Sequence, residues 1–279
     1  MAESELLPLV TSHHQATHPI RFVVVGAGGT GGRLIPPLMQ VVRRGDSVAI
    51  VDGDHVEDRN LARQNFRARD IGANKAEVMT QRYRRDGIAM DAYAAMLSDV
   101  SWREIMAGQE GAPPGGVIVL GCVDNALARQ TMQRMTNVHA SIWIDGGNET
   151  RGGQVILSAR DWPFTVKDPP RRGRTTWKEA AGPISIRGMD AMPQLLTAQP
   201  DAGGAGCADR LDLQTVAVNQ MSATCMLNAL TCILYKVPFS SCGVFFSTLN
   251  SMSPINLKRV DWDTASILPD MTYASPSTA

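Results

Sequence analysis

A glycine-rich segment near the start of the chain has the residue types and spacing of a phosphate-binding loop. Residues 26–31 read Gly-Ala-Gly-Gly-Thr-Gly, which matches the pattern G-x-G-x-x-G. Glycine lets the backbone turn tightly and approach phosphate oxygens with no Cβ in the way, and the helix that follows adds amide donors. The candidate phosphate-contacting residues are Gly26, Gly28, Gly29 and Gly31. Gly32 stands where a P-loop NTPase has its lysine, so that class is disfavoured.

Asp52 is placed to complete a nucleotide site. It directly follows the apolar run 47–51, which predicts the second strand. A carboxylate at this point of a βαβ unit accepts the two ribose hydroxyls of a nucleotide. The glycine loop and this acid together indicate nucleotide binding, but they fit NAD and ATP equally well.

A block of polar residues after Asp52 separates these two ligands. Its members are Asp54, Asn60, Arg63, Gln64 and Lys75. A dinucleotide has no need of them beside its phosphates. A triphosphate is bound well by the guanidinium of an arginine and the ammonium of a lysine. The same two groups offset the negative charge of the departing pyrophosphate. The alternative is that each of them is a solvated loop residue.

A second acidic position follows the apolar run 117–120. Residues 121–125 read Gly-Cys-Val-Asp-Asn. Ligands bind outside the carboxyl ends of strands in a doubly wound sheet, so Asp124 can hold Mg²⁺ against the phosphates, with Asn125 beside it. The alternative role for Asp124 is the N-cap of the next helix.

Strand and helix signals alternate along the chain and position these residues. Strands are predicted at 20–25, 47–51, 117–120, 142–144, 153–157, 244–249 and 255–260, and helices at 34–42, 75–85, 126–135 and 211–236. The alternation predicts an α/β, Rossmann-like doubly wound fold with a mainly parallel central sheet and a C-terminal strand pair. Pro36 and Pro37 must lie in the first turn of their helix or distort it.

The chain divides into three parts. Residues 1–19 predict a flexible arm, residues 20–268 a single domain, and residues 269–279 a frayed tail. Within the domain, residues 161–208 are rich in Pro, Gly and basic residues and predict a long crossover loop without regular elements. The basic run in this loop, at 171–178, is either a solvated face or a guide for a partner's tail.

The composition of the chain disfavours nucleic-acid-binding, membrane and zinc-binding proteins. Lys+Arg and Asp+Glu both total 27, so there is no basic excess for a nucleic-acid coat, and we expect no direct nucleic-acid binding. Neither a secretory signal nor a long uninterrupted apolar run is visible, so no membrane association is expected. The five cysteines include no Cys-x-x-Cys pair, which fits a reducing cytoplasm and predicts no structural zinc.

The order of these motifs resembles the ThiF/MoeB/HesA superfamily, whose members are relatives of the ubiquitin-activating enzymes. The resemblance rests on the glycine loop, Asp-x-Asp-x-Val at 52–56, Asn-Leu-x-Arg-Gln at 60–64, Lys75 and the Asp-Asn pair at 124–125. It covers about residues 20–260. The segment Asp-Gly-Gly-Asn at 145–148 and the overall length look most like the ThiF-type proteins of bacterial PRTRC plasmid systems.

The resemblance implies an ATP-dependent adenylyltransferase that activates the C-terminal glycine of a small β-grasp, ubiquitin-like or sulfur-carrier protein. It gives Arg63, Lys75 and Asp124 as catalytic residues, with Asp124 as the Mg²⁺ ligand. It also implies a homodimer. Two features common in the family are missing here: the zinc-binding Cys-x-x-Cys pairs, and an N-terminal arginine segment that reaches the partner subunit's nucleotide.

Cys207 is the candidate nucleophile. It lies in a glycine-rich stretch just before the helix predicted at 211–236, where an exposed thiol has its thiolate favoured. In the family, a nucleophilic cysteine occupies a mobile loop at a comparable place, which implies a covalent intermediate at Cys207. The alternative is a chance loop cysteine. Cys122, Cys225 and Cys232 are instead interpreted as buried packing.

Two other functions stay open on the sequence. An NAD-dependent oxidoreductase requires only the glycine loop and Asp52, and leaves Arg63, Lys75 and Asp124 unexplained. A non-catalytic adapter would keep the nucleotide-binding fold without using its chemistry.

Overall fold

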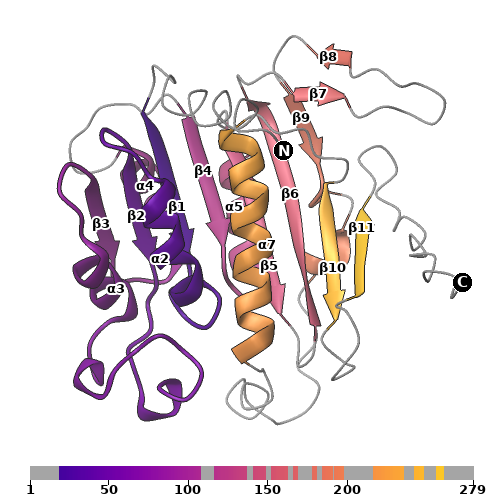
Figure 1. Cartoon of the computed structure of the whole chain (residues 1–279). Helices are drawn as coiled ribbons and strands as arrows, with labels where there is room; N and C mark the ends of the chain where they lie inside the picture. Colours follow the sequence, from indigo (N-terminus) through magenta and orange to yellow (C-terminus); the bar gives the residue numbers. More distant parts are fainter. Residues whose placement is uncertain are drawn as a thin grey trace, which may run out of the picture.

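The structure of the protein is a computed structural model (Figure 1). It describes residues 19–107, 116–136, 141–148, 152–162, 166–168, 178–180, 184–190, 192–197, 216–235, 242–247 and 256–260. Residues 1–18 of the predicted arm, the predicted tail at 269–279, Cys207 and the basic residues 171–174 lie outside the described residues.

Parallel strands form one half of the main sheet in the described part of the chain. They are β1 (Ile20–Val25), β2 (Ser47–Val51), β3 (Ala89–Tyr93), β4 (Gly116–Gly121) and β5 (Ser141–Asn148). Their spatial order is β3-β2-β1-β4-β5, and each neighbouring pair runs parallel. Every residue of β1 and β4 is buried, as expected for strands with helices on both faces.

The sequence pattern does not predict β3, because Asp91 interrupts its apolar residues. Asp91 is buried and forms an ion pair with Arg21 of β1, with Nη2 and Oδ2 2.6 Å apart. Arg21 also donates to the Ser47 hydroxyl and to the Ile105 carbonyl of α4 (Trp102–Ala107), a helix that is likewise not predicted. The charge inside β3 is therefore satisfied by tertiary pairing, which a local pattern does not reveal.

Antiparallel strands extend the sheet beyond β5. They are β6 (Gly152–Trp162), β9 (Ile184–Arg187), β10 (Gly243–Ser247) and β11 (Asn256–Val260). β6 pairs with β5, β9 and β10, and β10 pairs with β11. The predicted C-terminal strand pair is confirmed.

The prediction that residues 161–208 have no regular elements is wrong for the part that the structure describes. β6 runs on to Trp162, and β9 lies within this segment. The segment also holds β7 (Val166–Asp168) and β8 (Lys178–Ala180), which pair in a separate ribbon, and the 3-10 helix η4 (Pro193–Leu195). Strands this short are defined by their pairing partners rather than by a local pattern.

Helices cover both faces of the sheet. One face carries α2 (Gly31–Val41), α3 (Lys75–Tyr83) and α7 (Val216–Leu234), and α5 (Ala126–Thr136) lies behind β4 and β5 (Figure 1). Further short 3-10 helices are η1 (Asp58–Asn60), η2 (Ala68–Asp70) and η3 (Leu97–Asp99). This arrangement confirms the α/β doubly wound prediction.

α7 is the one described helix that is long and apolar enough to cross a bilayer by length and composition. It packs on α2, β5 and β6. Its buried side includes Val218, Ser222 and Met226, whereas Gln220 and Thr224 are exposed. The helix therefore has an inner face that belongs to the core of this fold.

Pro36 and Pro37 lie deeper in α2 than the sequence suggests, because the helix begins at Gly31 rather than at residue 34. Proline has no N–H, so Pro36 leaves the carbonyl of Gly32 without its usual helical donor. The side chain of Asn65 replaces that donor, with Nδ2 3.1 Å from the Gly32 carbonyl oxygen. The helix thus continues through both prolines, and the donor missing at Pro36 is replaced from outside the helix.

Candidate functional site

The carboxyl ends of β1 and β4 form the floor of a pocket where the strand order reverses. Gly26 N donates to the Val51 carbonyl, and Cys122 N donates to the Val25 carbonyl, both at 2.8 Å, so the ends of three strands are joined there. The pocket has a volume of about 400 Å³, within the range of small-molecule sites. Such a switch point is the usual ligand site of a doubly wound sheet.

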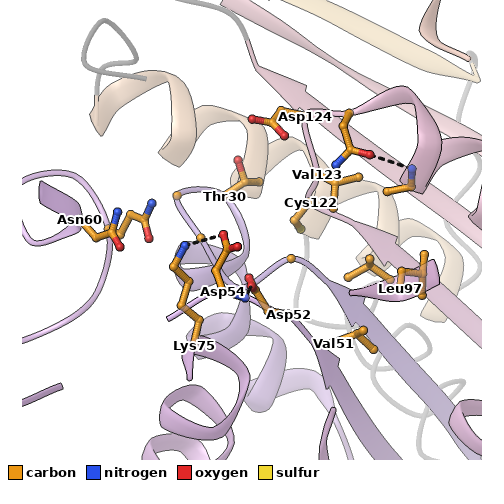
Figure 2. Close-up of a pocket in the computed structure, with 18 of the residues that line it drawn as sticks. Thr30, Val51, Asp52, Asp54, Asn60, Lys75, Leu97, Cys122, Val123 and Asp124 are labelled. Carbon is orange, nitrogen blue, oxygen red and sulfur yellow. Dashed lines mark hydrogen bonds and ion pairs between the residues drawn. The ribbon is translucent and has the colours of Figure 1, made fainter. Parts of the chain in front are cut away.

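The pocket brings together most of the predicted site residues (Figure 2). Those that line it are Gly26, Gly28, Gly29, Asp52, Asp54, Asn60, Arg63, Gln64, Lys75, Asp124 and Asn125. Gly31 is not among the lining residues. Cys207 lies outside the described residues.

Packing explains two of the loop glycines. Gly26 has φ +91°, and a Cβ there would lie 2.7 Å from the Cys122 carbonyl oxygen. A Cβ at Gly31 would overlap the Gly26 carbonyl oxygen. At Gly28 a Cβ would meet only the Gln64 side chain, at an ordinary 3.7 Å. Gly26 and Gly31 are therefore required by the conformation of the loop. Gly28 is not required by packing, and its missing side chain leaves the backbone of the loop accessible from the pocket.

Asp52 connects the glycine loop to the segment after β2. Its Oδ2 accepts from Ala27 N at 2.6 Å, and its Oδ1 accepts from Asp54 N at 2.9 Å. Burial raises the pKa of Asp52 above its usual value, and these two backbone N–H groups and Lys75 oppose that shift. Each carboxylate oxygen keeps a further lone pair that can accept a ribose hydroxyl.

Lys75 is the first residue of α3 and forms an ion pair with Asp54 at the wall of the pocket (Figure 2). The distance from Nζ to Oδ2 is 2.9 Å, and the side chains of Lys75 and Asp54 are 8% and 55% exposed. α3 begins here because Asn74 caps it, with Oδ1 accepting from the N–H groups of Ala76 and Glu77. An exposed carboxylate is a partner that a phosphate can replace.

Arg63 and Gln64 follow η1, which Asn60 closes by accepting from Glu57 N at 2.9 Å. Arg63 N and Gln64 N both donate to the Asn60 carbonyl, at 3.2 and 2.8 Å. Arg63 is buried, and its Nε has no hydrogen-bond partner within the described residues. A buried guanidinium nitrogen without a partner at the wall of a pocket fits an anionic ligand.

Asn125, rather than Asp124, caps α5. Its Oδ1 accepts from Ala128 N at 2.8 Å. Asp124 is exposed and lines the pocket, so its carboxylate is available to a ligand. Among the described residues, no group of three or more His, Cys, Asp and Glu could hold a metal ion. A Mg²⁺ ion held by one carboxylate together with substrate phosphates and water needs no such group.

One end of the pocket is apolar, a feature that the sequence reasoning missed. Val51, Met96, Leu97, Val123 and Ala128 line it beside Asp52. A flat, apolar base fits such a surface, and the adjacent carboxylate suits its ribose. The loop that carries Met96 gave no signal because it lies beyond β3, which the sequence does not predict.

The sequence also did not predict a set of hydrogen-bonded, uncharged polar side chains at the pocket. Asn148, at the end of β5, donates through Nδ2 to the Thr30 hydroxyl and to Asn219 Oδ1, the latter at 2.8 Å. Asn219 belongs to the first turn of α7 and is 1% exposed. The one sequence feature that could have indicated Asn219 is that it lies with Ser222 on one side of an otherwise apolar helix.

A buried ion pair supports the loop that carries Asp124. Arg129 Nε lies 2.9 Å from Asp145 Oδ2, and Arg129 Nη2 donates to the Val123 carbonyl at 2.8 Å. Burial raises the pKa of Asp145, and Arg129 opposes that shift. This pair joins α5 and β5 to the segment after β4.

The described cysteines are not suited to nucleophilic chemistry. Burial, with a contribution from Asp145, raises the pKa of the Cys122 thiol far above its usual range. Burial also raises the pKa of Cys225 and Cys232, which are only partly buried on α7 rather than fully in the core. Cys242 is buried.

A model of the ThiF family matches residues 7–176, and the chain therefore belongs to the ThiF family. Ubiquitin-like modifier-activating enzyme 5 of Oryza sativa subsp. japonica is 24% identical over 147 residues, which are 50% of this chain and 34% of that enzyme. The chain thus spans about a third of the length of this curated relative.

Solved structures share the fold. PaaA superposes with a TM-score of 0.57 at 13% identity, over 93% of this chain and 74% of that one. MccB of E. coli with ATP superposes with a TM-score of 0.57 at 14% identity, over 94% and 69% of the two chains. MccB with AMPCPP and MccA gives 0.56 at 14% identity, over 91% and 67%. Likeness at this level of identity concerns the fold alone.

Proposed function

We propose that the protein is an ATP-dependent adenylyltransferase that activates the C-terminal carboxylate of a small protein. The observation that carries this proposal is Arg63, whose buried Nε lacks a partner in the described part of the chain and lies in the same pocket as the glycine loop and Asp52. Membership of the ThiF family supports it. So do the likeness to a ubiquitin-like modifier-activating enzyme and the crystallisation of MccB with ATP.

The proposed reaction joins two anions. A carboxylate oxygen of the protein substrate attacks the α-phosphorus of ATP, the bond from that phosphorus to the bridging oxygen breaks, and pyrophosphate leaves. Asp52 holds the ribose, the loop amides contact the phosphates, and Arg63 and Lys75 offset the charge that develops on pyrophosphate. Asn60 and Gln64 position the phosphates beside them. Mg²⁺, when bound at Asp124, supplies further positive charge to the phosphates.

The substrate that we propose is a small β-grasp, ubiquitin-like or sulfur-carrier protein with a C-terminal glycine. We further propose a homodimer in the cytoplasm without structural zinc, and Cys207 as the thiol that accepts the activated carboxylate. The raised pKa values of Cys122, Cys225 and Cys232 support Cys207, because they disfavour the thiolate at three of the four other cysteines. A covalent adduct that mass spectrometry maps to a different cysteine would contradict that last assignment.

The nucleotide preference tests the proposal. Calorimetric titration of the full chain with Mg·ATP and with NAD should show tighter binding of ATP, because Arg63 and Lys75 suit a triphosphate. Binding of NAD as tight as that of ATP would favour the oxidoreductase instead.

The variant Arg63→Ala should lower the affinity for Mg·ATP by about ten- to a hundredfold, since one charged hydrogen bond to phosphate is worth about 1.5–3 kcal/mol. Arg103→Ala is the matched control, because Arg103 is exposed on α4 and does not line the pocket. Equal effects of the two variants would remove Arg63 from the site.

A further inference from the structure

The basic residues and the uncharged amides that line the pocket come from different elements. Arg63 and Lys75 belong to the segment after η1 and to α3. Thr30, Asn148 and Asn219 belong to the glycine loop, β5 and α7. The three uncharged side chains are linked in the hydrogen-bonded chain described above, which we call the amide cluster.

In the amide cluster, one polar atom of the Asn219 side chain is engaged and the other is not. Its Oδ1 is occupied as the acceptor for Asn148 Nδ2, at 2.8 Å. Its Nδ2 has no partner among the described residues, although the side chain is 1% exposed and lines the pocket. A buried amide nitrogen without an acceptor destabilises the fold, because its hydrogen bond to water is lost and no hydrogen bond within the protein replaces it.

Two glycines bring this nitrogen to the phosphate-binding loop. A Cβ at Gly29 would lie 2.6 Å from Asn219 Nδ2, so only glycine allows the amide to sit against the loop. A Cβ at Gly146 would overlap Met226 Sδ of α7, so glycine there lets the helix approach β5 closely. The close contact of α7 with the sheet is what places Asn219 over the pocket.

Ser222 shows that a polar atom without a partner is not sufficient. Its Oγ is also buried without a partner in the described part of the chain, one turn further along α7. It faces Gly146, and it does not line the pocket. Asn219 differs because its side chain lies against Gly29 of the loop and lines the pocket.

We propose that Asn219 Nδ2 donates a hydrogen bond to the carboxyl group of the protein substrate, so that the amide cluster is the acyl subsite of the pocket. This inference rests on the proposed adenylation. A neutral donor can orient one carboxylate oxygen without the charge neutralisation that an Arg or Lys would cause. The other oxygen stays free to attack phosphorus, and the same N–H then faces the acyl oxygen of the adenylate.

The test uses the full chain and three probes. One is 5′-O-(N-glycylsulfamoyl)adenosine, which mimics a glycyl adenylate; the second is 5′-O-sulfamoyladenosine, which lacks the glycyl group; the third is Mg·ATP. Calorimetry should show that the wild-type protein prefers the glycyl probe over its unacylated counterpart. Asn219→Ala should remove about tenfold of that preference, with the affinity for Mg·ATP changed less than about twofold.

Two further variants separate ligand binding from packing. Asn219→Asp keeps an acceptor for Asn148 and the size of the side chain but removes the donor, and it should lose the glycyl preference as well. Gln220→Ala removes an exposed amide one residue along α7 and should bind all three probes as the wild type does.

Three outcomes would overturn the inference: no glycyl preference in the wild type, a preference retained in Asn219→Ala or Asn219→Asp, or an equal loss of all three probes in both variants. The last would give Asn219 a structural role only. A wild-type protein that binds neither Mg·ATP nor either adenosine probe would instead overturn the proposed function.

Discussion

Asp52 stabilises the glycine loop even without a ligand. Its two oxygens hold the N–H groups of Ala27 and Asp54, so the carboxylate fixes the start of the loop against the end of β2. Burial makes its charged form less favourable, which raises its pKa. A nucleotide whose ribose hydroxyls add two more donors would favour the charged form.

The raised pKa of Asp52 gives a pH-dependent prediction. The folded protein binds more protons than the unfolded chain between the usual pKa of 3.8 and the higher folded value, so Asp52 destabilises the fold progressively as the pH rises through that window. The stability of Asp52→Asn relative to wild type should therefore increase with pH from below 3.8 and level off above the folded pKa. Urea unfolding at a series of pH values measures this difference, with Asp99→Asn, at an exposed carboxylate, as the control. A relative stability that falls with pH would contradict the assignment.

At the scale of elements, α2 depends on a side chain outside it. Asn65 supplies the donor that Pro36 lacks, and the same Nδ2 lies 2.9 Å from the Tyr83 hydroxyl at the end of α3. One amide therefore links α2, which follows the glycine loop, to α3, which carries Lys75.

The replacement Asn65→Ala should lower the free energy of unfolding by about 1–2 kcal/mol, because the Gly32 carbonyl loses its partner. Pro36→Ala restores a backbone N–H four residues after Gly32. In that background, Asn65→Ala should therefore cost less. Urea unfolding of the four proteins in a double-mutant cycle measures the coupling. Purely additive costs would show that Asn65 does not compensate for the proline.

At the scale of the whole molecule, the described part of the chain exposes large apolar side chains. Met96, Leu127 and Val216 are 51%, 60% and 48% exposed. Light scattering at micromolar concentration should give twice the chain mass of 30.1 kDa, as a twofold dimer requires. A fully active protein of 30.1 kDa would show that no second subunit is needed.

The sequence allowed the part of the pocket around Gly26, Asp52 and Asp124 to be predicted because these residues follow strands. Gly26 and Asp52 each come immediately after an apolar run, and Asp124 follows another closely. The amide cluster was not predictable in this way. Asn148 and Asn219 are 71 positions apart and meet only because of how closely α7 packs on β5.

Because of the close packing around the glycine loop, the presence of its motif in a relative indicates the fold rather than the activity. A Cβ at Gly26 or Gly31 would clash with a carbonyl oxygen of the protein itself, so a relative that kept the fold without the proposed function would still need both glycines. Gly28 and Arg63 are under no such constraint from packing against backbone. Divergence of activity within this fold would therefore appear first at residues 28 and 63, while Gly26 and Gly31 were retained.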